Sequence, residues 1–76
     1  MITKDELFLI KLYELGKDEE IDRYVVGRKM GQNDRSIDNI VKLLAQTNFI
    51  KKGEGSAVYL TDLGKQLVEE LINTKK

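Results

Sequence analysis

The chain has 76 residues, with 13 basic side chains balanced by 13 acidic ones and with neither cysteine nor histidine. This length predicts one domain over residues 1–76, because a second hydrophobic core would not fit. The missing residue types exclude disulfides, thiol and imidazole catalysis, and nearly every usual zinc site. We therefore expect a binding protein without metal or cofactor, and no enzyme.

No segment of the sequence has the pattern of a membrane span or a secretion signal. Apolar runs fall well short of the roughly 20 residues needed to cross a bilayer. The polar segment at residues 3–6 leaves no room for an apolar signal core. We therefore expect a cytoplasmic protein that does not bind to a membrane.

The neutral total hides an uneven distribution of charge. Residues 1–22 contain three lysines and seven acids, a net charge of −4, whereas residues 23–52 contain seven basic side chains and two acids, a net charge of +5. Neutralised phosphates supply most of the affinity of proteins for nucleic acid, so the positive middle segment keeps such a partner open. The alternative is that these charges form an ordinary solvated surface.

A first helix is expected over residues 4–15. Thr3 and Glu6 have the spacing of a capping box, in which each side chain bonds the backbone N–H of the other residue. Apolar side chains then follow at helical spacing, and Gly16 stands where a left-handed residue commonly ends a helix.

A very short strand and a second helix come next. We expect Ile21 to form the strand and to pair beside a later hairpin, and Asp22 to cap a helix over residues 23–30. Gly27 would let a facing helix approach closely. The side chains expected to pack inside are Tyr24, Val25, Val26 and Met30, and those expected outside are Arg23, Arg28 and Lys29.

A tight turn and a third helix follow. Gly31 can take the positive φ that ends the second helix, and Asn33 can cap a helix over residues 34–47. Asn48 tolerates the left-handed conformation that ends it. The side chains on its expected buried face are Ile37, Ile40, Val41 and Leu44.

The last third of the sequence predicts a hairpin and a final helix. An extended run that begins at residues 49–50 is expected to pair with residues 57–60, joined by a glycine-containing tip at residues 51–56. Thr61 can then cap a helix over residues 62–73, whose apolar side chains keep helical spacing.

The order helix, short strand, helix, helix, strand, strand, helix resembles the winged helix-turn-helix superfamily. The end of the hairpin, Tyr59-Leu60-Thr61-Asp62-Leu63-Gly64, is similar to the pattern that closes the wing in bacterial and archaeal regulators of the MarR and PadR kind. The resemblance covers nearly all of the chain. It implies a mainly α fold with a small β-hairpin, and a small protein that binds double-stranded DNA as a transcriptional regulator.

In that superfamily the second helix of the turn motif lies in the major groove, and the wing follows the backbone or enters the minor groove. The resemblance assigns these roles to helix 34–47 and to residues 51–56. Arg35 matches the edge of guanine and Asn39 that of adenine, while Ser36 suits phosphate or base. The expected DNA-binding residues are Arg28, Lys29, Asn33, Arg35, Ser36, Asn39, Lys42, Lys51 and Lys52.

Not every one of these assignments is unique. For Asn39 and Ser36, solvent-exposed polar filler on a helix is an equally good interpretation, and some of the lysines and arginines expected to contact phosphates are ordinary solubilising charges instead. Two copies of the chain could also pair through the first or the last helix.

Two acids on the expected reading helix depart from the pattern of a DNA reader. Asp34 and Asp38 repel phosphates unless they are paired or aimed at cytosine N4. Asp38 and Lys42 are four residues apart, which predicts an ion pair along the helix. These acids and the neutral total favour the alternative function, a winged helix module that binds another protein and does not touch DNA.

Overall fold

A computed structural model describes residues 2–17 and 19–73 of the chain. The described part is mainly helical with a small antiparallel sheet of three strands in the order β1-β3-β2. This confirms the expected class and order of elements. The elements are α1 (Lys4–Gly16), β1 (Ile21–Asp22), α2 (Arg23–Lys29), α3 (Asp34–Gln46), β2 (Ile50–Lys52), β3 (Ala57–Leu60) and α4 (Asp62–Asn73).

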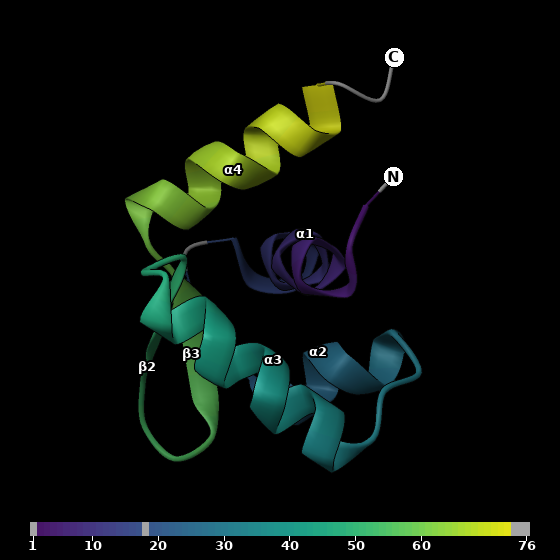
Figure 1. The fold of residues 1–76 in the computed structure, drawn as a ribbon. Helices are drawn as coiled ribbons and strands as arrows, with labels where there is room; N and C mark the ends of the chain where they lie inside the picture. Colours follow the sequence, from purple (N-terminus) through teal and green to yellow (C-terminus); the bar gives the residue numbers. More distant parts are fainter. Residues whose placement is uncertain (1, 18, 74–76) are drawn as a thin grey trace.

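Helix α1 runs through the middle of the molecule, with α4 on one side and the α2–α3 pair and the sheet on the other (Figure 1). Phe8 and Leu12 of α1 are fully buried, and burying such side chains contributes about 1.5–3 kcal/mol each. All four residues predicted for the buried face of the third helix are buried. The rest of the core comes from α2, β2, β3 and α4 and includes Val26, Ile50, Val58, Leu60 and Val68.

The start of α1 is as predicted, but its end is not. The Glu6 N–H donates to Thr3 Oγ1 at 3.1 Å and the Thr3 N–H to Glu6 Oε1 at 2.9 Å, which completes the capping box. The prediction that Gly16 is the left-handed cap is wrong, because α1 includes Gly16 and Lys17 takes the positive φ of 51°. Gly16 is needed for space, since a Cβ there would overlap the side chain of Ile21.

The turn between α2 and α3 forms as the sequence predicts. Gly31 has a φ of 77°, and the Asn33 side chain accepts the Ser36 N–H at 2.9 Å. Gly27 is buried, and a Cβ on it would overlap the side chain of Ile37. The predicted close approach of the two helices is therefore confirmed, and it sets how α3 lies on α2.

Two side chains of α2 exchange the environments predicted for them. Val25, expected inside, is 47% exposed, and the side chain of Arg23, expected outside, is 13% exposed. The helix has seven residues, and Val26 and Gly27 take its buried side against α1 and α3. This rotation turns Val25 to solvent and Arg23 toward the sheet.

The short first strand is confirmed, and it completes the sheet. Strand β3 lies between β1 and β2. Its residue Val58 is opposite Ile21 of β1 on one side and opposite Lys52 of β2 on the other. Strand β2 starts at Ile50, one residue later than expected, and Asn48 has the predicted left-handed conformation with a φ of 67°. The sheet thus joins the start of α2 to the hairpin that follows α3.

Candidate nucleic-acid interface

The outward face of α3 carries three of the residues predicted to contact DNA. Arg35, Asn39 and Lys42 are exposed, and spacings of four and three residues place them on one side of the helix. No ion-pair partner of Arg35 or Lys42 lies among residues 2–17 and 19–73. This face therefore presents two unpaired cations with an amide between them.

The remaining predicted residues near α3 are less available for contact. The amide oxygen of Asn33 already accepts the Ser36 N–H, and Ser36 is half-buried beside the start of α1. Arg28 is exposed, but its guanidinium donates to Asp34 at 3.2 Å and lies 5.8 Å from the centre of the Tyr24 ring. These three side chains are already engaged in contacts within the turn and between the helices.

Both aspartates of α3 pair with side chains of α2, on the flank of α3 next to the face formed by Arg35, Asn39 and Lys42. Asp34 pairs with Arg28, and Asp38 lies 3.6 Å from Nη1 of Arg23. The Tyr24 hydroxyl also donates to Asp38 at 2.8 Å. The predicted pairing of Asp38 with Lys42 is therefore wrong, because the crossing of α2 over α3 brings Arg23 and Tyr24 to that flank.

This pairing changes how the local charge is distributed. Of the seven basic side chains in residues 23–52, two arginines neutralise the two acids, so the net +5 is carried by the remaining five. All five are exposed and have no ion-pair partner among the residues that the structure describes. They are Lys29, Arg35, Lys42, Lys51 and Lys52.

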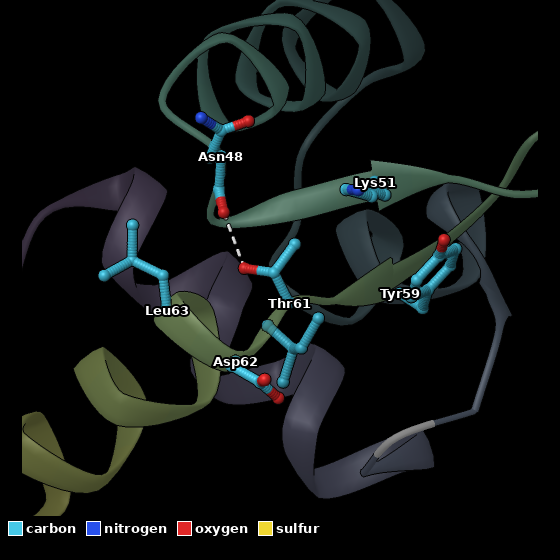
Figure 2. A pocket seen from close by; sticks show the side chains of 7 residues that line it. Asn48, Lys51, Tyr59, Thr61, Asp62 and Leu63 are labelled. Carbon is cyan, nitrogen blue, oxygen red and sulfur yellow. Dashed lines mark hydrogen bonds between the residues drawn. The ribbon is translucent and has the colours of Figure 1, made fainter.

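The two lysines of the hairpin point to opposite faces of the sheet. Side chains alternate along a strand, so Lys52 shares the face of buried Ile50, and Lys51 lies on the other face. Lys51 is opposite Tyr59 on β3, and Figure 2 shows both side chains on the same side of the hairpin. The two lysines therefore reach different regions of any surface that the hairpin approaches.

A hollow lies between the end of α3, β3 and α4, and the polar groups that line it include Thr61, which is already hydrogen-bonded within the protein. The Thr61 hydroxyl donates to the Asn48 carbonyl, as Figure 2 shows, and accepts the Gly64 N–H at 3.1 Å. Thr61 thus caps α4, as predicted, and ties it to the end of α3. Asp62 on the same rim pairs with Lys65 at 3.6 Å. Lys51 is the basic side chain on this rim.

The tip of the hairpin is residues 53–56, shorter than the predicted 51–56 because Lys51 and Lys52 belong to β2, and it is held by polar contacts that the sequence did not predict. Ser56 Oγ donates to Asp22 Oδ2 at 3.1 Å, and the Glu54 N–H donates to Glu20 Oε1 at 3.4 Å. A Cβ on Gly53 would overlap the same Glu20 carboxylate. These partners are more than thirty residues apart in the chain, and no local pattern in the sequence indicates them.

The bond between Tyr24 and Asp38 should be visible in a pH titration. The hydrogen bond to the carboxylate, and its negative charge, raise the pKa of Tyr24 above its ordinary value of 10.0. We expect ultraviolet absorbance to show one tyrosine step above the ordinary range. The Tyr24→Phe change should remove this step, and Asp38→Asn should return it toward the ordinary value.

The sign of the linked stability follows from the raised pKa. A group whose pKa is higher in the folded state stabilises that state below the unfolded pKa, and this contribution disappears as pH rises through the folded pKa. The stability difference between the parent and Tyr24→Phe should therefore shrink at strongly alkaline pH. Loss of a step within the ordinary range in Tyr24→Phe would contradict the assignment.

Comparison of the chain with models of protein families, with curated proteins and with solved structures finds no match. In the described segments, no helix is both long and apolar enough to cross a membrane, and no three acidic side chains are grouped so that they could hold a metal ion. A functional assignment therefore depends on the geometry and charge of α3 and the hairpin.

Proposed function

We propose that the chain is a winged helix protein that binds double-stranded DNA and regulates transcription. Helix α3 enters the major groove, and the wing, residues 51–56, lies on the backbone or in the minor groove. The observation that carries this proposal is that both acids of α3 are paired, whereas several exposed cations around α3 are not. Both aspartates are paired on the flank that faces α2, whereas the exposed cations lie on the outward face of α3, at the end of α2 and on the wing.

The proposed roles follow from the chemistry of each exposed side chain. Arg35 offers a planar fork of donors to the O6 and N7 atoms of guanine, and Asn39 offers a donor and an acceptor to adenine. Lys42 lies at the more C-terminal end of the same face, where it contacts a phosphate. The other phosphate contacts come from Lys29, Lys51 and Lys52.

Titration of duplex DNA with the parent protein at several salt concentrations tests the proposal. Each neutralised phosphate contributes about −0.9 to the slope of log K against log salt. Since the two wing lysines point to opposite faces, we expect three or four phosphate contacts and a slope of about −3 to −4. Fluorescence anisotropy of a labelled duplex measures this slope.

The control for this titration is a lysine outside the proposed interface. Lys11 lies on α1 and pairs with Glu14 at 3.5 Å, so Lys11→Gln should leave the slope unchanged. A slope close to zero, or no binding of duplex DNA at low salt, would contradict the proposal.

The second candidate is a winged helix module that contacts a protein in place of DNA. Leu43 on α3 is 46% exposed beside a groove lined by Leu9, Phe49 and Leu67, and phosphate binding makes no use of such an apolar surface. The same titration separates the two candidates. A steep salt dependence favours DNA binding, and absence of duplex binding at low salt favours the protein module.

A further inference from the structure

We infer that Arg23 is a positioning residue that fixes the wing relative to α3, and does not itself contact DNA. The inference rests on the proposed function, because it concerns the two elements assigned to the major groove and to the backbone. Arg23 belongs to the positive segment 23–52, and from charge alone it would be grouped with the side chains that contact DNA.

One arginine bridges three elements of the fold. Its Nε donates to the Ser56 carbonyl at 3.0 Å, and its backbone N–H donates to the same oxygen at 3.0 Å. On the other side, Nη1 lies 3.6 Å from Asp38 Oδ1. Arg23 is the first residue of α2, Ser56 ends the wing and Asp38 belongs to α3. The side chain therefore connects the wing directly to the proposed reading helix.

Burial separates Arg23 from the basic residues proposed to contact DNA. Its side chain is 13% exposed, whereas that of Arg28, five residues further along α2, is 65% exposed. Its donors are directed at partners within the protein. Arg23 is thus poorly placed to neutralise a phosphate, although it belongs to the same positive segment.

Both ends of this bridge are themselves held in place. The Ser56 hydroxyl donates to Asp22 Oδ2 at 3.1 Å, and the Tyr24 hydroxyl donates to Asp38 at 2.8 Å. A guanidinium offers donors in fixed directions within one plane, so it can bond two such partners at once. A lysine carries all its donors on one nitrogen at the end of a flexible stem, so it cannot hold the two partners in the fixed relative positions that Nε and Nη1 impose.

Fixing the wing matters because two linked contacts bind more tightly when their separation already fits the target. A wing that is ordered before binding does not lose conformational freedom on the DNA. Loss of the bridge should therefore weaken the contribution of the wing without removing any atom that touches DNA.

A distance measurement in the free protein tests the position of the wing. The chain has no cysteine, so Gln46→Cys on α3 and Glu54→Cys on the wing give two unique spin-label sites. We expect a narrow distance distribution in this labelled parent, and a distribution about twice as wide after Arg23→Lys, since the wing then opens locally. Asp38→Asn, which weakens only the α3 end of the bridge, should also widen it.

Arg28→Lys is the matched control, because Arg28 pairs α2 with α3 but has no contact with the wing. It should leave the distribution unchanged. Thermal unfolding of each variant establishes that it is folded. An unchanged width in folded Arg23→Lys and Asp38→Asn variants would overturn the inference.

Duplex binding supplies the second measurement. Lys52→Ala should weaken binding by the parent severalfold, and should have little further effect in the Arg23→Lys background, because an unfixed wing contributes little. If Lys52→Ala costs as much in the Arg23→Lys background as in the parent, the wing binds independently of Arg23, which would overturn the inference. If the parent binds no duplex DNA, the proposed function fails, and the distance distributions still decide whether Arg23 fixes the wing.

Discussion

Replacement of Gly64 by alanine is expected to lower the free energy of unfolding by at least about 2 kcal/mol, although alanine is the better helix former. In an exposed helix the same change stabilises by about 1 kcal/mol. In this protein a Cβ would overlap the backbone carbonyl oxygen of Phe49 and lie 3.1 Å from Leu60 Cδ2. The Phe49 carbonyl cannot move away freely, because it accepts the Thr61 N–H at 3.2 Å.

Urea unfolding followed by circular dichroism measures this loss. Gln66→Ala, on the exposed side of the same helix, is the control and should change stability by no more than about 0.5 kcal/mol. A domain of this size has about 4–11 kcal/mol of total stability, so the loss at Gly64 is a large share of it. Equal or greater stability of Gly64→Ala would show that α4 does not approach the start of the hairpin this closely.

The parts of the fold that could be predicted depend on contacts between near neighbours in the chain. The caps at Thr3, Asn33 and Thr61 each join residues that are three apart, so the spacing of residue types was enough to find them. The positive φ at Gly31 follows in the same way from a residue type that accepts it. The buried face of α3 was predictable because its 13 residues repeat the apolar period several times.

The predicted sides of Val25 and Arg23 were wrong because α2 is too short to carry a clear period. Helix α2 spans seven residues, and its apolar run at Tyr24, Val25 and Val26 does not show which side is buried. Packing decides this, because the close approach at Gly27 fixes the rotation of the helix and turns Val25 outward. At the end of α1, Gly16 stays in the helix, where a Cβ would overlap Ile21, and Lys17 takes the positive φ.

The candidate site also contains features that local spacing predicts and contacts that it does not predict. Helical spacing predicted that Arg35, Asn39 and Lys42 lie off the buried face of α3, and in the structure they are exposed. The partners of Asp38 could not be found in this way, because they lie on another helix. The ties of the wing are more distant still, since they join residues 33 and 34 positions apart. The sequence therefore shows which side chains are exposed on α3, but not what holds the wing beside it.

Arg35→Ala is expected to weaken binding to the preferred duplex by about tenfold to a hundredfold, and binding to unrelated duplexes much less. A two-donor contact with guanine is worth about 1–3 kcal/mol of discrimination between bases. The guanidinium of Arg35 is exposed and unpaired within the described part of the chain, so its removal should not disturb the fold. Competition binding with duplexes that differ at single base pairs measures both losses.

Lys42→Ala is the matched comparison, because Lys42 shares the face, the exposure and the lack of an ion-pair partner among the described residues, but has a single charged nitrogen. As a phosphate contact it should weaken binding to all sequences alike and reduce the salt slope by about 1. Arg35→Ala should leave most of the slope and lose the preference among sequences. If both variants lose affinity uniformly and neither loses preference, Arg35 binds phosphate, and base recognition by α3 would fall to Asn39.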